Sequence, residues 1–338
     1  MKVAVPEAEL QRLAAAALER LGVPAADAQL CARVLVLGDL FGLGTHGTSR
    51  VESYGERLAL GSVKARPDIR VERVAPTMAK VDGDSGLGPV VGMHALEEAM
   101  AMARETGTGL VFARNSNHFG PVAPYSYLAA EQGFASIIGS NASTTIAPTG
   151  GKEARLGNSP VAFAVPNPGG RPFILDMALS VAARAKIRNA AKAGQAIPDT
   201  WATDKEGRPT TDARAALDGF LLPIGGHKGY GLALVVDLFA GLLSGAAYLT
   251  HVNSWSESPE LPGNLGHFYF LFDASRLGSA EWLHDRMVDF AAILHDTPPS
   301  DALKPVRIPG EHELDNLERQ RRDGIALDAA FVEWLKAQ

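Results

Sequence analysis

Residues 225–231 read Gly-Gly-His-Lys-Gly-Tyr-Gly and run directly into the apolar segment 232–243. A glycine cluster at the start of an apolar helix leaves several backbone N–H groups free at the positive end of the helix dipole. His227 and Lys228 add an imidazole and an ammonium group at the same place. The combination suits an anion such as a phosphate or a carboxylate. The alternative is a glycine-rich helix start that only packs closely, with Lys228 in water.

Two more histidines lie in settings that suit catalysis. His46 lies in the segment Thr45-His-Gly47, between two segments of helical periodicity, and His118 follows directly after the apolar segment 109–113. A histidine at the end of a strand lies where sheet enzymes place functional groups. Imidazoles also cap turns, so a histidine taken alone is more often structural than catalytic.

Arg50 lies one helical turn after His46. Its planar guanidinium group can hold a carboxylate through two parallel hydrogen bonds. The alternative is a surface ion pair with Glu52, Glu56 or another acidic residue.

Polar side chains also collect where expected strands end. Asn141, Asn158 and Asp176 each end or follow such a strand. Residues at strand ends meet at one edge of a sheet, so we expect these three to share one cleft. Turn formation by Asn and Asp is the other interpretation.

Other kinds of chemistry find little support in the sequence. The histidines show no His-Glu-x-x-His spacing and no carboxylate-rich loop is present, so we expect no metal. Cys31 is the single cysteine, which excludes a disulfide framework within the chain. No Gly-x-Ser-x-Gly segment points to nucleophilic hydrolysis.

The elements that must position these residues can be read from the hydrophobic period. The first sixty residues favour three helices, at 7–22, 27–41 and 49–60. Short β-rich segments follow at 77–81, 109–113, 134–139, 161–165, 172–175 and 267–272. Between them lie segments of helical period at 89–106, 122–132, 180–193 and 229–244, and the tail returns to helix at 279–295, 311–322 and 327–337.

This order predicts a mixed α/β (α+β) fold with a helical module contributed by both chain ends. We expect residues 1–70 to form the module together with C-terminal helices at about 279–338, and residues 71–278 to form a mixed-sheet domain. Residues 159–175 favour an antiparallel hairpin around the turn 166–170, so the sheet is not expected to be purely parallel.

Residues 42–47 fit the pattern G-x-G-x-x-G of dinucleotide-binding Rossmann folds. That fingerprint must follow a strand and open a helix, with an acidic residue about 20 positions later at the end of a second strand. Here the preceding segment has helical periodicity and no such strand follows. We therefore reject the Rossmann interpretation and expect these glycines to join two helices.

Composition and charge limit the possible partners. The formal net charge is −6 and no stripe of lysine and arginine is present, which argues against nucleic acid. No apolar run is long enough for a membrane span, so no membrane partner is expected. Charged residues Glu7, Glu9 and Arg12 interrupt the region where a signal peptide would be apolar. We expect the protein to act in the cytoplasm.

Several stretches together resemble the malate/L-lactate dehydrogenase type-2 family. They occur in the family's order over about residues 25–275. The stretches are Gly44–Gly47 with Arg50, Asn115–Gly120, Ala147–Gly151, Gly157–Pro160, Asp176–Ser180, Ile197–Trp201 through Asp212, and Leu222–Leu232.

The resemblance implies an oxidoreductase that is NAD(P)-dependent, does not use a Rossmann fold and acts on small 2-hydroxy or 2-oxo acids of the malate, lactate, ureidoglycolate or sulfolactate type. It also implies a homodimer. His46 or His118 would transfer the proton, and the substrate carboxylate would meet Arg50, with Thr45 and Lys228 nearby. The implied cofactor contacts are Asn141, Asp176, Met177, Ala178, Ser180, His227, Lys228, Gly310 and Glu311.

The chain departs from the family pattern in places that bear on the substrate. Thr45 replaces the usual serine, Asn158-Ser-Pro160 replaces an Asn-Pro pair, and Ala142 stands where ureidoglycolate enzymes have a serine. A reductase of cyclic imine carboxylates, of the Δ1-piperideine-2-carboxylate type, is the nearest rival within the fold. A non-catalytic anion- or nucleotide-binding protein is the alternative from another class.

The choice between NAD and NADP depends on basic residues after Asp176. Arg184, Lys186 and Arg188 could meet the 2′-phosphate of NADP, or could form a solvated helix face. We expect the solvated face, and hence NAD.

Overall fold

The protein is described by a computed structural model that covers residues 1–255 and 257–337. Its centre is a seven-stranded sheet with the order β2-β3-β4-β10-β5-β8-β9. β3 and β4 pair in parallel, and the other neighbours pair antiparallel, which confirms the predicted mixed sheet. The strands are β2 Arg70–Ala75, β3 Met78–Asp82, β4 Thr108–Ser116, β5 Phe134–Ser140, β8 Val161–Val165, β9 Phe173–Met177 and β10 Leu265–Asp273.

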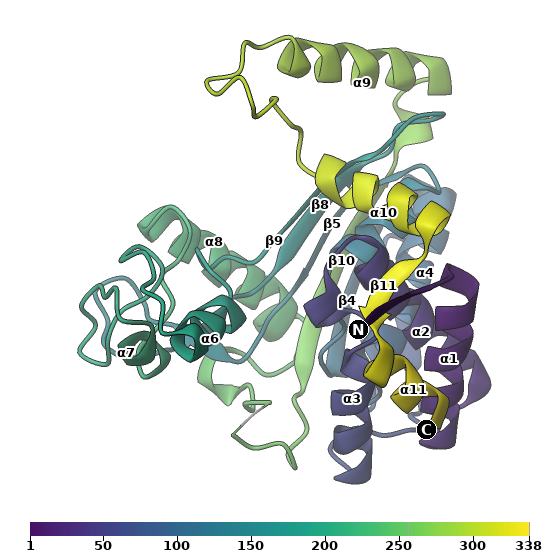
Figure 1. The fold of residues 1–338 in the computed structure, drawn as a ribbon. Coiled ribbons are helices and arrows are strands. Elements are labelled where there is room, and N and C mark those ends of the chain that lie inside the picture. Colours follow the sequence, from purple (N-terminus) through teal and green to yellow (C-terminus); the bar gives the residue numbers. More distant parts are fainter. Residues whose placement is uncertain (256, 338) are drawn as a thin grey trace.

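β10 shows how this sheet separates two apolar cores. Successive side chains of a strand point to opposite faces. Tyr269 and Leu271 therefore enter one core and Phe268 enters the other, with Phe270 packed against it. The first core contains α1 Glu7–Arg20, α2 Ala25–Leu40, α4 Gly88–Thr106 and α5 Ala123–Ala130, and the second contains α6 Arg184–Ala193, α7 Ala213–Leu217 and α8 His227–Asp237 (Figure 1).

The parallel pair β3–β4 needs a crossover, and α4 supplies it. Gly109 of β4 lets this helix approach the sheet closely, because a Cβ at this position would lie 2.0 Å from the carbonyl oxygen of Ala99. The helix predicted at 89–106 is therefore found with nearly its expected bounds.

The two chain ends lie together, as Figure 1 shows. β1 Lys2–Val5 pairs antiparallel with β11 Ile325–Asp328, a pairing that the sequence analysis missed. α3 Arg50–Ala59, α10 Glu311–Asp323 and α11 Ala329–Ala337 surround them, whereas α9 Ala280–His295 lies across the far end of the sheet (Figure 1). Where the domain boundaries fall remains a prediction.

Two predicted helices have different limits in the structure. The segment expected at 180–193 becomes helical only at Arg184, and the preceding residues 178–183 pass the cavity described below. The segment expected at 229–244 begins at His227 as α8 and continues as a π-helix from Leu238 to Leu243. The predicted hairpin at 159–175 is present as β8 and β9. Among the described residues, no helix is long and apolar enough for a bilayer crossing.

Candidate active site

A cavity of about 470 Å³ lies between the helical module and the sheet. Segments 43–57, 117–122, 140–143, 158–160, 176–183, 252–255 and 263–265 contribute to its wall. It collects many of the residues that the sequence analysis singled out, namely His46, Arg50, His118, Asn141, Asn158, Asp176 and Ala178. The cleft expected for Asn141, Asn158 and Asp176 is therefore present.

The loop that carries His46 is held by Asp39 at the end of α2. The backbone N–H and the hydroxyl group of Thr48 both donate to Asp39 Oδ2, at 2.8 and 2.6 Å. Gly47 allows this approach, because a Cβ there would lie 2.0 Å from Asp39 Oδ1. Burial raises the pKa of Asp39 to about 6. The glycines at 42–47 thus follow a helix and shape a short 3-10 turn at Gly44–His46, so the rejection of a Rossmann loop agrees with the structure.

The rings of His46 and His118 stack with their centroids 5.6 Å apart and an interplanar angle of 29°. Burial, followed by the charge of Arg50, lowers the pKa of His46 to about 4. The same two causes hold the pKa of His118 well below its usual value. Both imidazoles are consequently neutral near pH 7, which is the form that can take a proton from a hydroxyl group.

The phenol of Tyr54 contacts His118, and Tyr54 was not singled out in the sequence as a site residue. Its phenolic oxygen lies 2.9 Å from His118 Nδ1 and 3.1 Å from the carbonyl oxygen of the same residue. The backbone N–H of Gly120 approaches Nδ1 at 3.4 Å. Tyr54 lies four residues after Arg50, hence on the same face of α3, and this spacing was the available signal.

Arg50 reaches the cavity with spare donor capacity. Its Nε is buried and has no hydrogen-bond partner among the described residues. No ion pair joins it to Glu52 or Glu56, both of which lie within the described part of the chain. The structure therefore favours the carboxylate-binding interpretation over the surface ion pair.

Asp176 is the penultimate residue of β9 and contacts the first turn of α5. Its Oδ2 accepts a hydrogen bond of 2.8 Å from the backbone N–H of Ala123. Burial raises its pKa to about 6, against the lowering effect of this backbone contact. Ala178, two residues later, lines the cavity, while Met177 packs against the second core.

Asn141 and Ser180 use their polar groups within the protein. Asn141 donates to the carbonyl oxygen of Ala247 at 2.6 Å and accepts from the N–H of Gly266 at 3.0 Å. The hydroxyl group of Ser180 donates to the carbonyl oxygen of Ala182 at 3.0 Å. Asn141 thereby shapes the wall of the cavity, whereas Ser180 is buried and does not line it.

His227 and Lys228 open α8 and are exposed, away from the wall that holds Arg50. His227 lines a second cavity of about 340 Å³, together with Gly150, Gly226 and neighbouring residues. The structure thus does not bring Lys228 to His46 and His118. Two backbone hydrogen bonds, from Val181 to Leu222 and from Ile224 to Leu179, tie this second cavity to the segment that follows Asp176.

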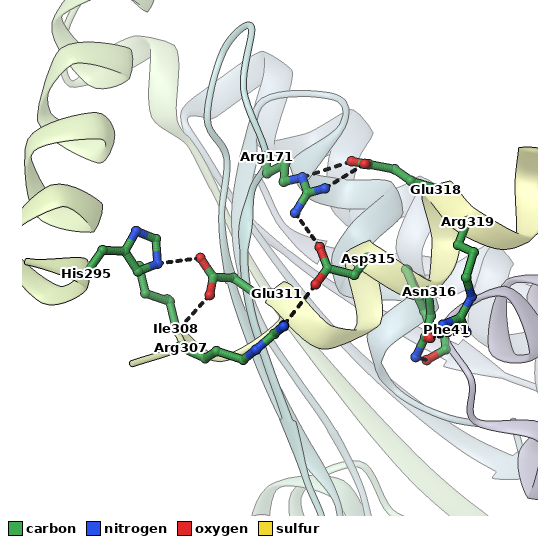
Figure 2. Close-up of polar contacts among 10 residues, drawn as sticks. All are labelled: Phe41, Arg171, His295, Arg307, Ile308, Glu311, Asp315, Asn316, Glu318 and Arg319. Carbon is green, nitrogen blue, oxygen red and sulfur yellow. Dashed lines mark hydrogen bonds and ion pairs between the residues drawn. The ribbon is translucent and has the colours of Figure 1, made fainter. Parts of the chain in front are cut away.

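Gly310 and Glu311 lie at the start of α10, beside the same edge strand. Gly310 has a φ of 93°, and a Cβ there would lie 2.5 Å from the carbonyl oxygen of Ile174 in β9. Figure 2 shows Glu311 held between His295 Nε2 at 2.7 Å and the N–H of Ile308 at 3.0 Å. Further along α10, Asp315 and Glu318 pair with Arg171 of the β8–β9 hairpin (Figure 2). This network fixes α10 against β9, two residues from Asp176.

His267 lies directly behind the cavity wall and was not singled out in the sequence. It is fully buried, with its two nitrogens 2.9 Å from Ser140 Oγ and 2.7 Å from Ser116 Oγ. Its ring stacks on Phe119 with centroids 4.1 Å apart. It therefore joins β4, β5 and β10 beneath the segment that carries His118. Within the described residues, no three or more His, Cys, Asp or Glu side chains gather in an arrangement that could hold a metal ion.

Comparison with known proteins connects this geometry to a family. The sequence profile described as malate/L-lactate dehydrogenase matches residues 5–336. The chain is 36% identical to malate dehydrogenase from Pyrococcus horikoshii over 98% of its own length and 94% of the relative. It is 38% identical to (2R)-3-sulfolactate dehydrogenase (NADP(+)) from Chromohalobacter salexigens, over 97% of the chain and 96% of the relative.

Solved structures agree with this result. The structure of Δ1-piperideine-2-carboxylate reductase from Pseudomonas syringae pathovar tomato is similar with a TM-score of 0.89 and 28% sequence identity, covering 99% of each chain. The fold and the sequence thus lead to the same conclusion: the chain belongs to the malate/L-lactate dehydrogenase family and is an oxidoreductase.

Proposed function

We propose that the cavity of His46, Arg50 and His118 is where a small 2-hydroxy acid is oxidised, or the corresponding 2-oxo acid reduced, with a nicotinamide coenzyme. One observation supports this most directly. Two neutral, stacked imidazoles and a guanidinium group with a free buried N–H share one cavity. A 2-hydroxy acid presents the matching groups, a carboxylate next to a hydroxyl-bearing carbon.

Arg50 holds the carboxylate, which places the reacting carbon near the imidazoles. Such positioning is a large source of rate, because it converts an encounter into a fixed geometry. A histidine then takes the hydroxyl proton during oxidation and returns it during reduction, a contribution of about 10²–10⁴-fold.

Tyr54 makes His118 the better candidate for this proton transfer. When the phenolic O–H of Tyr54 donates to the carbonyl oxygen of His118, the phenolic oxygen can accept a hydrogen bond from Nδ1–H, and in this tautomer the N–H of Gly120, 3.4 Å from Nδ1, does not donate to that nitrogen. Nε2 of the neutral ring is then free to accept a proton. His46, whose Nδ1 lies 2.9 Å from Thr45 Oγ1, would orient the substrate oxygen.

The residues along β9 and beyond fit a nicotinamide dinucleotide. When bound, this coenzyme supplies or accepts the hydride. Asp176 and Ala178 would face its nicotinamide end, with Asn141 shaping that wall and Met177 and Ser180 close to them in the chain. The N-terminus of α8, with His227 and Lys228 exposed beside an open glycine-lined cavity, would face phosphate groups. Gly310 and Glu311 would make a further contact from α10.

We propose NAD rather than NADP as the coenzyme. Of the three basic residues considered above, Arg184 donates to the carbonyl oxygen of Leu217, while Lys186 and Arg188 are exposed. This arrangement supports the solvated face expected from the sequence. The ratio of kcat/KM for the two reduced coenzymes tests the choice.

We also propose a cytoplasmic homodimer. Exposed apolar side chains support a dimer, since they gather on α9 at Val288, Phe290 and Ile293 and on the π-helical segment at Leu238, Leu242 and Leu243. The mass of the protein measured by light scattering after size exclusion tests this part; a monomer at micromolar concentration would contradict it.

The central test follows the absorbance of the reduced coenzyme with a panel of 2-oxo acids and Δ1-piperideine-2-carboxylate. We expect turnover with at least one 2-oxo acid, and a loss of at least about 100-fold in His46→Gln and His118→Gln. His312→Gln, at an exposed site on α10, is the control. Turnover of the cyclic imine alone would favour the reductase alternative, and no turnover of any panel member would overturn the proposal.

A further inference from the structure

Trp255 contributes the largest apolar side chain of the cavity wall and lies next to the imidazole of His118. The two ring centroids are 5.4 Å apart at an interplanar angle of 72°. Leu43, Val252 and Leu265 line the same cavity. The cavity wall thus contains indole and aliphatic carbon, together with the polar side chains of Arg57, Asn117 and Asn253.

Arg57 fixes the indole from the side of α3. Its guanidinium carbon lies 4.8 Å from the Trp255 ring centroid, a cation–π distance. Nη1 and Nη2 donate to the carbonyl oxygens of Trp255 and Leu261, at 3.4 and 2.9 Å. Arg57 is only 3% exposed, and its pKa is lowered by burial although nearby Glu260 acts in the opposite direction.

The segment that carries Trp255 is tied down at several further points. Ser62 Oγ donates to the carbonyl oxygen of Pro259 at 2.7 Å, and Asn253 Nδ2 donates to that of Pro262 at 2.8 Å. The N–H of Gly263 donates to Asn117 Oδ1 at 3.3 Å. The indole is thus a preformed part of the wall, which is how binding sites achieve selectivity.

The two arginines of α3, Arg50 and Arg57, differ in how far their guanidinium nitrogens are already hydrogen-bonded. Both line the cavity and each has a buried Nε–H without a partner among the described residues, but the terminal nitrogens of Arg57 already donate to carbonyl oxygens and its guanidinium group covers the Trp255 ring. A second acid group on the substrate would have to displace those contacts of Arg57 or lie unpaired against indole, and either is costly.

We infer that Trp255 is a specificity-determining residue that receives the side chain of the substrate and selects 2-oxo and 2-hydroxy acids with a branched aliphatic or aromatic side chain over dicarboxylates and sulfonates. The inference rests on the proposed function of the cavity. An apolar side chain that removes indole surface from water gains affinity, and each additional methylene in such a pocket is worth about 10-fold or more in kcat/KM.

The first test compares kcat/KM for 2-oxoisocaproate and phenylpyruvate with that for oxaloacetate and 3-sulfopyruvate. We expect the better apolar acid to exceed both dianions by at least about 10-fold. Preference for oxaloacetate or 3-sulfopyruvate would overturn the inference and assign the second acid group to Arg57. Failure of every 2-oxo acid would instead overturn the proposed function, so the two failures are distinguishable.

The second test is the ratio of kcat/KM for 2-oxoisocaproate to that for pyruvate within each variant, which cancels general damage to the site. Trp255→Ala should lower this ratio at least about 10-fold, and Trp255→Phe should keep most of it. An unchanged ratio in Trp255→Ala would overturn the role of the indole.

A binding measurement complements these ratios. In the presence of oxidised coenzyme, 2-oxoisocaproate should quench the tryptophan fluorescence of the wild type and of Trp282→Phe, whose mutated residue is exposed on α9. The quenching should be lost in Trp255→Phe. Equal quenching in all three proteins would contradict contact between the acid and Trp255.

Discussion

The phenolic oxygen of Tyr54 lies 2.9 Å from Nδ1 of His118, although the two residues are 64 positions apart in the chain. Tyr54 is on α3, one turn after Arg50. The same helix therefore carries the guanidinium group proposed to hold the substrate and the phenol that orients the proposed base. Any shift of α3 would move both groups together, which couples substrate position to imidazole orientation.

Removing this phenol tests its positioning role. We expect Tyr54→Phe to lower kcat about 10-fold or more, because His118 loses the contact that fixes its tautomer and ring orientation. KM for the acid should change little, since Arg50 is untouched. Steady-state kinetics with NADH and the best 2-oxo acid supply both constants.

Tyr125→Phe is the matched control, because Tyr125 is equally buried and its hydroxyl group donates to the carbonyl oxygen of Phe119 outside the His118 contact. This variant should lose thermal stability but keep most of kcat. If both variants lose kcat to the same extent, Tyr54 has only a structural role.

The guanidinium fork of Arg50 can be tested by a change that keeps its charge. In Arg50→Lys we expect KM for the acid to rise at least about 10-fold, because an ammonium group cannot make two parallel hydrogen bonds to a carboxylate. The Kd of NADH should stay nearly constant. An unchanged KM would remove Arg50 from the substrate site.

Asp176 is proposed to contact the coenzyme, and its carboxyl group can be neutralised with little change of shape. Asp176→Asn should weaken NADH binding at least about 10-fold, since the amide replaces one acceptor oxygen with an N–H donor near the end of β9. Titration of NADH fluorescence measures the Kd. Asp199→Asn, at an exposed position, serves as the control, and equal affinities in both variants would argue against the contact.

Buried His267 predicts how unfolding depends on pH. Burial lowers its pKa from 6.5 to about 3 in the folded protein. Between these values the unfolded chain binds a proton that the folded chain does not, so the free energy of unfolding falls as pH falls. His46 adds to this loss down to about pH 4, whereas Asp39 and Asp176, with pKa values raised to about 6, oppose it.

The variant His267→Gln separates these contributions, because glutamine can still bond to Ser116 and Ser140 but does not titrate. Its Tm should decline less steeply than that of the wild type between about pH 6.5 and pH 4.5. His312→Gln should follow the wild-type slope. Parallel slopes for all three proteins would show that His267 contributes no such dependence.

Much of the fold could be predicted because many of its helices and strands follow from the hydrophobic period of their own residues. The helix at 89–106 and the strand at 161–165 have an uninterrupted hydrophobic period, and both appear with nearly the expected limits. β1 and β11 were missed because each has only four residues, and they become strands only by pairing across almost the whole chain. The start of the helix at 180–193 was placed too early because residues 178–183 are held by contacts with distant segments rather than by their own period.

The candidate site likewise has features that the local sequence sets and features that long-range packing sets. The sequence by itself determined which groups are present, since His46, Arg50, His118 and Asp176 stand at turns, helix starts and strand ends whose residue types are local information. Only the tertiary structure decided which of them meet. Lys228 was expected near the substrate, but α8 begins on the far side of segment 178–183, outside the cavity of Arg50.

The roles proposed for Tyr54 and Trp255 could not be recognised from the sequence. An apolar or aromatic residue on a helix or in a loop looks the same in sequence whether it fills a core or faces a ligand. The difference arises from long-range packing, which places Tyr54 behind His118 and lets Arg57 hold Trp255 beside it. Side-chain chemistry is therefore encoded one residue at a time, whereas the low pKa of each imidazole and the shape of its cavity come from burial, a property of the whole fold.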